Sequence, residues 1–396
     1  MNLIEALFYG LAVTFPFGQL SRLPLTFGQF NEVNIYLLDL LVFAILTSWL
    51  IWHWWNKKKI LTSTYTKSLF SFWIILLFSW LINFKRYFLQ ETLVGLGYLV
   101  RFIVYSSLSL VVYDLGKRHS KINKNYILNC FCRWSIILSL VGITQYLFLP
   151  DTRFLLASGW DEHYFRVIGP FLDPNFLGLV LALGILGIIW ELREIKGNWR
   201  RILLAIIIGI PFFLTYSRSS YLALLVGVAV WLFLQKKQRI FFIFLFTFLF
   251  LLLLLPRPGG EGVKLERVAS IEQRIESWQQ ALVIWQKNPL FGVGFNNYRY
   301  FSRDSDFFST DWQINKAGAG VENSFLFILA TSGVIGLMGL IGLIRRIVIE
   351  TLASKSNFKY LVLPSLAAIT IHSFFLNSFF YPWVIVWWSF LMSLID

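Results

Sequence analysis

The stretch Ser324-Phe-Leu-Phe-Ile-Leu-Ala-Thr-Ser-Gly-Val-Ile-Gly-Leu-Met-Gly-Leu-Ile-Gly-Leu-Ile344 decides the fold class of this chain. No residue in it carries a charged side chain. As an α-helix the stretch rises by about 30 Å, which equals the thickness of the hydrocarbon core of a lipid bilayer. We therefore expect it to cross a membrane as a helix.

Apolar runs of this kind recur along the whole chain. They are about 15 to 23 residues long, enough to cross the hydrocarbon core as helices. Hydrophobic residues make up 57% of the sequence and charged residues only 14%, about half of the share in soluble globular proteins. The composition excludes a soluble globular protein and predicts an all-α, polytopic transmembrane helix bundle of about twelve spans. The expected spans lie near Ile4–Leu20, Ile35–Trp55, Leu69–Ile82, Thr92–Tyr113, Tyr126–Leu149, Phe176–Trp190, Ile202–Tyr216, Tyr221–Leu234, Ile240–Leu255, Ser324–Ile344, Tyr360–Asn377 and Trp383–Ile395.

Basic residues alternate between the segments that connect these spans. The chain holds 35 Lys and Arg against 21 Asp and Glu, a net charge of +14. Because Lys and Arg stay on the cytoplasmic side of membrane proteins, the basic segments should be cytoplasmic, as should both termini. We expect a multi-pass protein of the cell (inner) membrane whose charge sets its orientation in lipid, with no nucleic acid as partner. The basic segments lie near residues 57–67, 117–124, 193–201, 236–239 and 345–359.

One connecting segment, Pro256–Glu322, is long and should be extracytoplasmic. It divides the chain into residues 1–255 with the first nine spans, the loop 256–322, and residues 323–396 with the last three spans. Apolar residues recur in the loop at intervals of three and four, which predicts an amphipathic helix on the membrane or on the outer mouth of the bundle. Asn288-Pro289 should end this helix, and a turn should follow at Phe291–Gly294. The apolar positions are Val268, Ile271, Ile275, Trp278, Leu282 and Trp285.

Polar and basic side chains stand where three helices should enter the membrane from outside. A helix amino terminus carries a partial positive charge and unpaired N–H groups, and arginine binds phosphate through two parallel hydrogen bonds. These residues together would form a site for a diphosphate or another polyanion. The alternative is that each arginine lies among lipid headgroups. The residues are Arg166 before the helix start Asp173-Pro174-Asn175, Arg218 between Ser217 and Ser219, Asn323 before Ser324, and Arg267 and Arg274 on the loop helix.

Arg101 lies midway along its expected span. A charged side chain there costs about 2.5 to 3.5 kcal/mol of insertion free energy unless it faces a polar interior. We expect Arg101 either to act in a functional site or to form an ion pair with a buried carboxylate. Asp39 is the candidate partner.

Other titratable residues are weaker candidates. Asp304-Ser-Asp306 has the spacing of a glycosyltransferase metal motif, and Asp161-Glu-His163 holds metal-ligand residue types. Both are more typical of solvated loops, so we expect no metal site. His372 lies inside the eleventh expected span, either as a packed hydrogen-bonding residue or as a proton relay.

Several short motifs follow one another in the second half of the chain. They are Arg166-Val-Ile-Gly-Pro-Phe-Leu-Asp-Pro-Asn175, Tyr216-Ser-Arg-Ser219, Arg274-Ile-Glu-Ser-Trp278 with Asn288-Pro-Leu-Phe-Gly-Val-Gly294, and Glu322-Asn-Ser-Phe-Leu326 with Gly333-Val-Ile-Gly336. Their order, their position at outer span ends and the long loop before the tenth span resemble the O-antigen ligase and O-antigen polymerase superfamily of polytopic membrane proteins. The resemblance covers about Phe165–Leu340.

This resemblance implies a metal-independent glycosyltransferase that uses no cofactor and acts in cell-envelope polysaccharide biosynthesis. Members move a preassembled glycan from a polyprenyl diphosphate to an acceptor hydroxyl on the outer face of the plasma membrane. The partners would be a polyprenyl-diphosphate-linked glycan donor, a glycan or glycolipid acceptor, and membrane lipids. Arg218 and Arg274 would hold the diphosphate as catalytic residues. The residues expected to bind substrate are Arg166, Asn175, Arg267 and Asn323.

Glu322 stands where this superfamily often has the histidine that is its presumed base for the acceptor hydroxyl. A carboxylate can accept that proton in a suitable environment, so Glu322 is the third candidate catalytic residue. The alternative is an ordinary helix-start carboxylate stabilised by the helix dipole.

A transporter of a small anion or solute such as bicarbonate is the competing interpretation, because this superfamily has been linked to such carriers; a non-catalytic assembly factor is a third. Coupled transporters usually place several carboxylates or matching broken helices at mid-membrane. Here Asp39 is the one clear intramembrane acid, and the polar residues gather at the outer mouth. The pattern therefore favours glycan transfer. Ligase and polymerase share a donor and differ in acceptor, so the motifs fit both.

Overall fold

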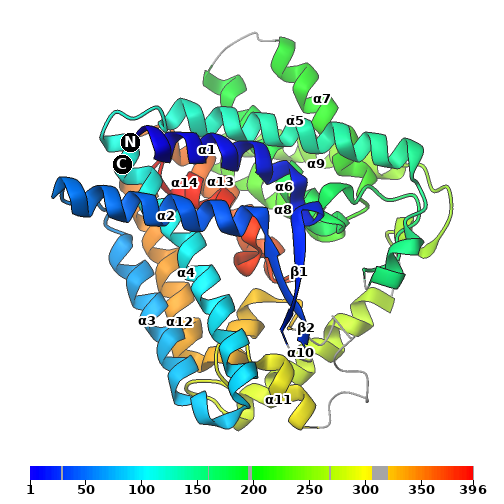
Figure 1. Cartoon of the computed structure of the whole chain (residues 1–396). Coiled ribbons are helices and arrows are strands. Elements are labelled where there is room, and N and C mark those ends of the chain that lie inside the picture. Colours follow the sequence, from blue (N-terminus) through cyan, green and yellow to red (C-terminus); the bar gives the residue numbers. More distant parts are fainter. Residues whose placement is uncertain (28–29, 159, 195–198, 267–268, 306–319, 396) are drawn as a thin grey trace.

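The chain folds into a bundle of α-helices with one small β-hairpin, seen in a computed structural model (Figure 1). The structure describes residues 1–396 except 28–29, 159, 195–198, 267–268, 306–319 and 396. In this described part the strands are β1 (Arg22–Phe27) and β2 (Phe30–Tyr36). The helices are α1 (Asn2–Thr14), α2 (Leu37–Asn56), α3 (Thr66–Ile82), α4 (Leu89–Lys117), α5 (Lys124–Phe148), α6 (Pro174–Glu194), α7 (Trp199–Leu214), α8 (Arg218–Leu234), α9 (Gln238–Leu253), α10 (Ala269–Lys287), α11 (Tyr298–Asp304), α12 (Ser324–Ala353), α13 (Lys359–His372) and α14 (Pro382–Met392).

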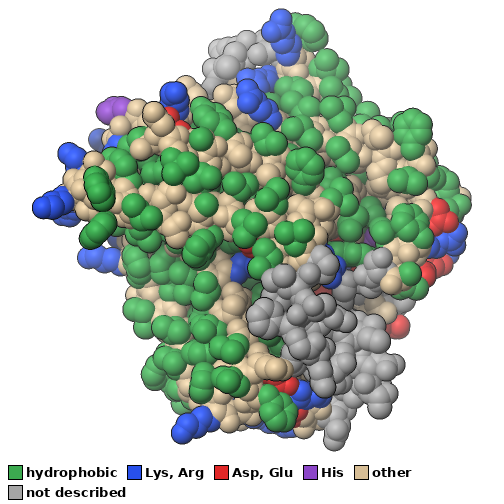
Figure 2. Space-filling model, in the orientation of Figure 1, with side chains coloured by type: hydrophobic (Ala, Val, Ile, Leu, Met, Phe, Trp, Pro, Cys, Tyr) green, Lys and Arg blue, Asp and Glu red, His purple; other side chains and the backbone are tan. Residues whose placement is uncertain are grey.

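The predicted spans coincide with α1 to α9 and α12 to α14. Within the described residues, 7 helices are long and apolar enough to cross a membrane. Hydrophobic side chains cover much of the face shown in Figure 2, and Lys and Arg gather toward its edges. The fold class, an all-α polytopic membrane bundle, is confirmed, while the number of spans stays a prediction. The 7 segments are Asn2–Ser21, Leu37–Asn56, Thr66–Arg86, Leu89–Lys117, Lys124–Phe148, Pro174–Leu192 and Ser324–Ala353.

The β-hairpin between α1 and α2 was not predicted. Strands β1 and β2 pair antiparallel, with Leu23 opposite Ile35. The second span is predicted to begin at Ile35, but that residue lies in β2, which ends at Tyr36, and α2 begins at Leu37. The backbone N–H of Tyr36 donates to Oδ2 of Asp39 (2.8 Å), which fixes the start of α2. Apolar residues alternate with other residues in β1, a pattern with the period of a strand that total hydrophobicity does not reveal.

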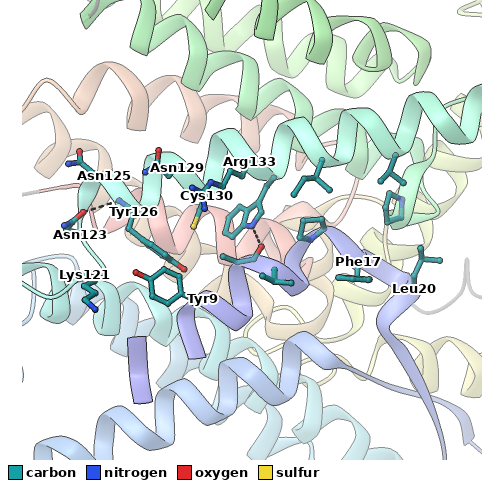
Figure 3. Close-up of a pocket in the computed structure, with 17 residues that line it drawn as sticks. Tyr9, Phe17, Leu20, Lys121, Asn123, Asn125, Tyr126, Asn129, Cys130 and Arg133 are labelled. Carbon is teal, nitrogen blue, oxygen red and sulfur yellow. Dashed lines mark hydrogen bonds between the residues drawn. The ribbon is translucent and has the colours of Figure 1, made fainter. Parts of the chain in front are cut away.

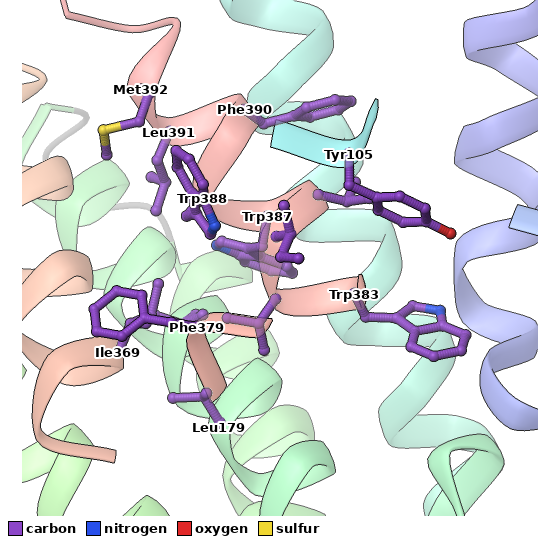
Figure 4. Close-up of a cluster of buried hydrophobic side chains, with 14 of the residues drawn as sticks. Tyr105, Leu179, Ile369, Phe379, Trp383, Trp387, Trp388, Phe390, Leu391 and Met392 are labelled. Atoms are coloured by element: carbon purple, nitrogen blue, oxygen red, sulfur yellow. The ribbon is translucent and has the colours of Figure 1, made fainter. Parts of the chain in front are cut away.

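Helix α14 is buried inside the bundle, and several of its side chains belong to the hydrophobic cluster in Figure 4. Trp383 and Trp387 are almost fully buried, and the ring of Phe131 from α5 stacks on Trp387 with 4.3 Å between ring centroids. Nε1 of Trp383 donates to the backbone carbonyl of Phe15 (3.0 Å). The 11 residues of α14 rise by about 17 Å, less than the hydrocarbon thickness. Its hydrophobicity therefore reflects burial in protein as much as any contact with lipid.

Helix α12 is interrupted at Gly333, whose backbone φ is +67°. The loop that follows α10 packs against this break and replaces the lost helical hydrogen bonds. The N–H of Val293 donates to the carbonyl of Ala330 (3.1 Å), and the N–H of Val334 donates to the carbonyl of Pro289 (2.9 Å). A broken helix is tolerated at membrane depth where protein satisfies the freed backbone groups. We call the loop Asn288–Gly294 together with the break the α12 joint.

Side chains from α3 and the residues after it complete the α12 joint. Three of them donate to successive carbonyls of the inserted loop, so its backbone is satisfied inside the protein. A Cβ on Gly333 would lie 2.1 Å from the carbonyl oxygen of Leu290, so this approach requires glycine. The donors are Ser79 Oγ to Phe291 (2.9 Å), Asn83 Nδ2 to Gly292 (3.3 Å) and Tyr87 OH to Val293 (2.7 Å).

The predicted amphipathic helix of the long loop is confirmed as α10, which ends at Lys287, directly before Asn288-Pro289. Ala281 and Ile284, which are not part of the predicted apolar stripe, are buried, while the stripe residues Ile271, Ile275 and Leu282 are 43%, 45% and 38% exposed. The helix therefore packs on the bundle along a face beside the predicted stripe and leaves much of the stripe on the outside.

The predicted pairing of Arg101 is also confirmed. Its Nη2 lies 2.8 Å from Oδ2 of Asp39. The same guanidinium lies over the rings of Tyr36 and Tyr98. A charge in mid-span is thus neutralised between α2 and α4, and the pair has a structural explanation.

Candidate active site

Arg218 is the first residue of α8. The preceding Ser217 caps the helix, because its Oγ accepts from the backbone N–H of Ser220 (3.3 Å). Arg218 is half-buried, and its Nη1 donates to the backbone carbonyl of Leu265, in the long loop just before α10 (3.2 Å). The positive end of α8 and the Arg218 guanidinium therefore lie at the same place, under the loop.

Arg274 and Glu322 form an ion pair between α10 and the start of α12. The distance from Nε of Arg274 to Oε2 of Glu322 is 2.9 Å. The side chain of Arg274 is 17% exposed and that of Glu322 is 57% exposed. Nε1 of Trp278, one turn after Arg274, donates to the backbone carbonyl of Glu322 (3.4 Å). The carboxylate thus stands at the surface beside a largely buried guanidinium.

The two arginines lie at the same part of the long loop. Arg218 contacts Leu265 just before α10, Arg274 lies on α10, and the two positive charges repel each other. Two like charges raise the energy of the empty site, and an anion placed between them removes that repulsion. Planar guanidiniums bind phosphate oxygens through paired hydrogen bonds. The geometry is therefore that of a polyanion site with an exposed carboxylate at its edge.

Residues 202–341 match the family model described as O-antigen ligase. This segment of the chain is therefore similar to the O-antigen ligase family. The matched segment contains Arg218, Arg274 and Glu322, the three candidate catalytic residues. The family supports a role in glycan transfer at a membrane. No curated protein matches the chain significantly.

Asn323 lies within the O-antigen ligase segment and caps α12. Its Oδ1 accepts from the backbone N–H groups of Phe325 (2.9 Å) and Leu326 (3.1 Å). The cap of this helix is therefore Asn323 and not its neighbour Glu322, although both were considered for the helix start. The substrate-binding role predicted for Asn323 would have to coexist with this capping role.

Asn175 lies outside the matched segment but contacts the start of α8. Its Oδ1 accepts from Ser217 Oγ (2.9 Å), and Ser220 Oγ donates to its backbone carbonyl (2.9 Å). The first turns of α6 and α8 are joined in this way. The preceding Asp173 caps α6, because its Oδ1 accepts from the N–H groups of Asn175 (2.6 Å) and Phe176 (3.2 Å). Burial raises the pKa of Asp173 to about 6.

His372, at the end of α13, contacts the two serines that follow Arg218. Its Nε2 lies 3.2 Å from Ser219 Oγ and 3.3 Å from Ser220 Oγ, and its Nδ1 lies 2.7 Å from Ser378 Oγ. The ring is fully buried, and the charge of Arg274 acts on it. The sequence allows two roles for His372, a packed hydrogen-bonding residue or a proton relay. Its position against α8 depends on the packing of α13 on α8, which no local motif encodes.

Arg166 is buried beside the start of α8, where it donates hydrogen bonds to backbone carbonyl groups. Its Nε donates to the carbonyl of Thr215 (2.9 Å) and its Nη2 to that of Tyr216 (3.5 Å). With 6% of its surface exposed, Arg166 positions the connection between α7 and α8. The fourth predicted arginine, Arg267, lies outside the described residues.

Proposed function

We propose that the chain transfers a glycan from a polyprenyl diphosphate to an acceptor hydroxyl, as an O-antigen ligase or polymerase. The observation that carries this proposal is the gathering of Arg218, Arg274 and Glu322 at the starts of α8 and α12. Outside a cell no nucleotide sugar is available, so the diphosphate itself has to activate the sugar. Two arginines next to an exposed carboxylate supply what such a transfer needs.

In the proposed reaction the bond between the anomeric carbon of the donor and the phosphate oxygen breaks. The leaving polyprenyl diphosphate carries away the bonding electron pair, and Arg218 and Arg274 stabilise its growing charge. The acceptor oxygen forms the new bond to the anomeric carbon. Its proton passes to the carboxylate of Glu322, the proposed base.

The ion pair of Arg274 with Glu322 links the two halves of this proposal. Arg274 uses its Nε for the carboxylate, which leaves its terminal nitrogens to face an incoming phosphate. Because more than half of the Glu322 side chain is exposed, an acceptor hydroxyl can approach it directly. An acceptor that contacts Glu322 is thereby held next to a diphosphate that contacts Arg274. This arrangement would orient the two substrates toward each other.

Replacement of Arg218 tests the proposal. We expect Arg218→Ala to lower glycan transfer by about 10³-fold with the native lipid-linked donor, because a developing charge loses its stabilising group. Arg218→Lys should recover little, since an ammonium cannot form the paired contacts of a guanidinium. The measurement is transfer by purified protein that elutes as a single species.

Arg153→Ala is the matched control, because Arg153 is exposed and pairs with Asp151 at the surface. It should leave transfer unchanged. Full activity of Arg218→Ala would disprove the proposed site. A fall in both variants would point to a general effect of removing positive charge.

The same proposal requires the site to face outward in the cell (inner) membrane, with both termini cytoplasmic. A single cysteine at Ser305, after α11, should react with an impermeant thiol reagent in intact cells, in a background without the native cysteines. A cysteine at Lys58, after α2, should react only after the cells are opened. Labelling of Lys58→Cys in intact cells would reverse the orientation.

A further inference from the structure

A groove of about 840 Å³ runs along the surface between α1 and α5 (Figure 3). The two helices point the same way, because Tyr126 OH donates to the carbonyl of Phe8 (2.6 Å) and Trp134 Nε1 to that of Ala12 (2.8 Å). Both helices belong to the segments that are long and apolar enough to cross a membrane. The groove is therefore open to the lipid around the bundle.

One side of the groove is a single row of α5 and the turn before it, with a residue at every fourth position. Residues four apart lie on one face of a helix, so the row forms one continuous strip. Its first four members are polar or basic and its last two are apolar. In order they are Lys121, Asn125, Asn129, Arg133, Ile137 and Val141.

The side of the groove formed by α1 also changes from polar to apolar along its length. Tyr9 lines the groove opposite the polar half, and Phe17 and Leu20 line it toward the apolar half. The groove is thus polar at the end where α5 begins and apolar at the end where α1 passes into the hairpin. A lipid molecule shows the same change in polarity, from a polar headgroup to apolar acyl chains.

Arg133 decides what the groove binds. It is exposed on a spanning helix, and no carboxylate in the described part of the chain forms an ion pair with it. Its Cα–Cβ bond tilts toward the start of α5, which carries the guanidinium toward Asn129 and Lys121. No acidic residue is among the described residues that line the groove. The nearby Glu5 accepts from the backbone N–H of Lys121 (3.0 Å) and is buried outside the lining.

We propose that this groove binds an anionic phospholipid, with its phosphate at Arg133 and Asn129 and its acyl chains along Ile137 and Val141. An arginine at this depth is costly in hydrocarbon unless an anion accompanies it, and the phosphate of a lipid is the anion available there. Asn125 and Asn129 donate to phosphate or glycerol oxygens in the same row. In the orientation proposed above, the lipid belongs to the cytoplasmic leaflet.

Lipid binding is measured by adding phosphatidylglycerol or phosphatidylcholine to delipidated protein in detergent and counting bound molecules by native mass spectrometry. We expect one phosphatidylglycerol to bind more tightly than phosphatidylcholine. Arg133→Gln should weaken phosphatidylglycerol about fivefold, the effect of one basic residue near an anionic lipid surface. Millimolar inorganic phosphate should not displace the lipid, because the apolar half of the groove also holds it.

Arg345→Gln is the matched control, since Arg345 is an exposed arginine on α12 away from this groove. It should bind phosphatidylglycerol like the parent chain.

Val141→Trp keeps every charge but fills the apolar half of the groove, and should also weaken the binding of phosphatidylglycerol. Thermal unfolding in phosphatidylcholine checks that each variant is folded. Equal binding of the two lipids, or undiminished phosphatidylglycerol binding by Arg133→Gln and Val141→Trp, would overturn the proposal; displacement by phosphate would assign the site to a free anion.

Discussion

The α12 joint and the arginine site both consist of short motifs of the O-antigen ligase segment, yet they differ in how their polar atoms are used. In the joint the carbonyls and N–H groups of the inserted loop are paired inside the protein. At the site Glu322 is exposed, and Arg218 and Arg274 repel each other. A motif whose polar groups are satisfied internally serves the fold, whereas one that gathers like charges beside an exposed carboxylate points to a ligand.

The α12 joint also determines where Arg274 and Glu322 lie relative to each other. Helix α10 carries Arg274 and continues directly into the loop that fills the break in α12. The same α12 begins just after Glu322. The joint therefore fixes α10 against α12 and sets the distance between Arg274 and Glu322. We infer that damage to the joint disturbs both regions, while damage to the site leaves the joint intact.

The largest expected effect comes from Gly333→Val, which attacks the joint. The new Cβ would lie 2.1 Å from a carbonyl oxygen, and the backbone φ of +67° is strained for a β-branched residue. We expect a loss of more than about 3 kcal/mol in the free energy of unfolding, enough to prevent recovery of folded protein. Expression and elution as a single species measure this.

Gly342→Ala on the same helix is the control, because a Cβ there meets nothing within 4 Å. Alanine favours helix over glycine by about 1 kcal/mol, so this variant should be at least as stable as the parent. A well-folded, active Gly333→Val protein would mean that α12 can be continuous and that the joint is not needed.

Glu322→Gln is the matching change at the site. The amide keeps the size of the side chain but cannot accept the acceptor's proton, so transfer should fall by about 10²-fold. Unfolding should change little, because the carboxylate is 57% exposed and contacts Arg274 at the surface of the bundle. Donor concentration dependence and thermal unfolding, measured on one preparation, separate the two effects. An active Gln variant would assign the proton to another group.

The helices could be predicted from the sequence because hydrophobicity and period are local properties. The helices at the twelve apolar runs, and α10 with its end before Asn288-Pro289, follow from such patterns. The ion pair of Arg101 with Asp39 followed from the cost of a charge in mid-span, which leaves few partners. The three candidate catalytic residues could be proposed because family motifs contain all three, with Arg218 and Glu322 at helix starts and Arg274 on the loop helix.

Other features depend on contacts between segments that are distant in the sequence. The glycines of the joint show in the sequence that something approaches closely, but not that the loop after α10 enters α12. The burial of α14 was hidden because a lipid-facing helix and a helix inside a bundle have the same composition. The contacts of His372 with Ser219 and Ser220 arise only when α13 packs on α8. The hairpin could have been found from the alternation in β1.

The smallest expected effect separates capping from substrate binding at Asn323. Its Oδ1 accepts two N–H groups of α12, so Asn323→Ala should cost about 1 kcal/mol of stability, the usual value of a helix cap. Asn323→Asp keeps an acceptor oxygen at the cap and should restore stability. If capping is the whole role, the Asp variant also restores transfer. If the side-chain amide contacts the donor, Asp restores unfolding but not transfer, because a second carboxylate beside Glu322 repels the diphosphate. The Asp variant therefore shows whether the residue that caps α12 serves the fold, as the joint does, or the site.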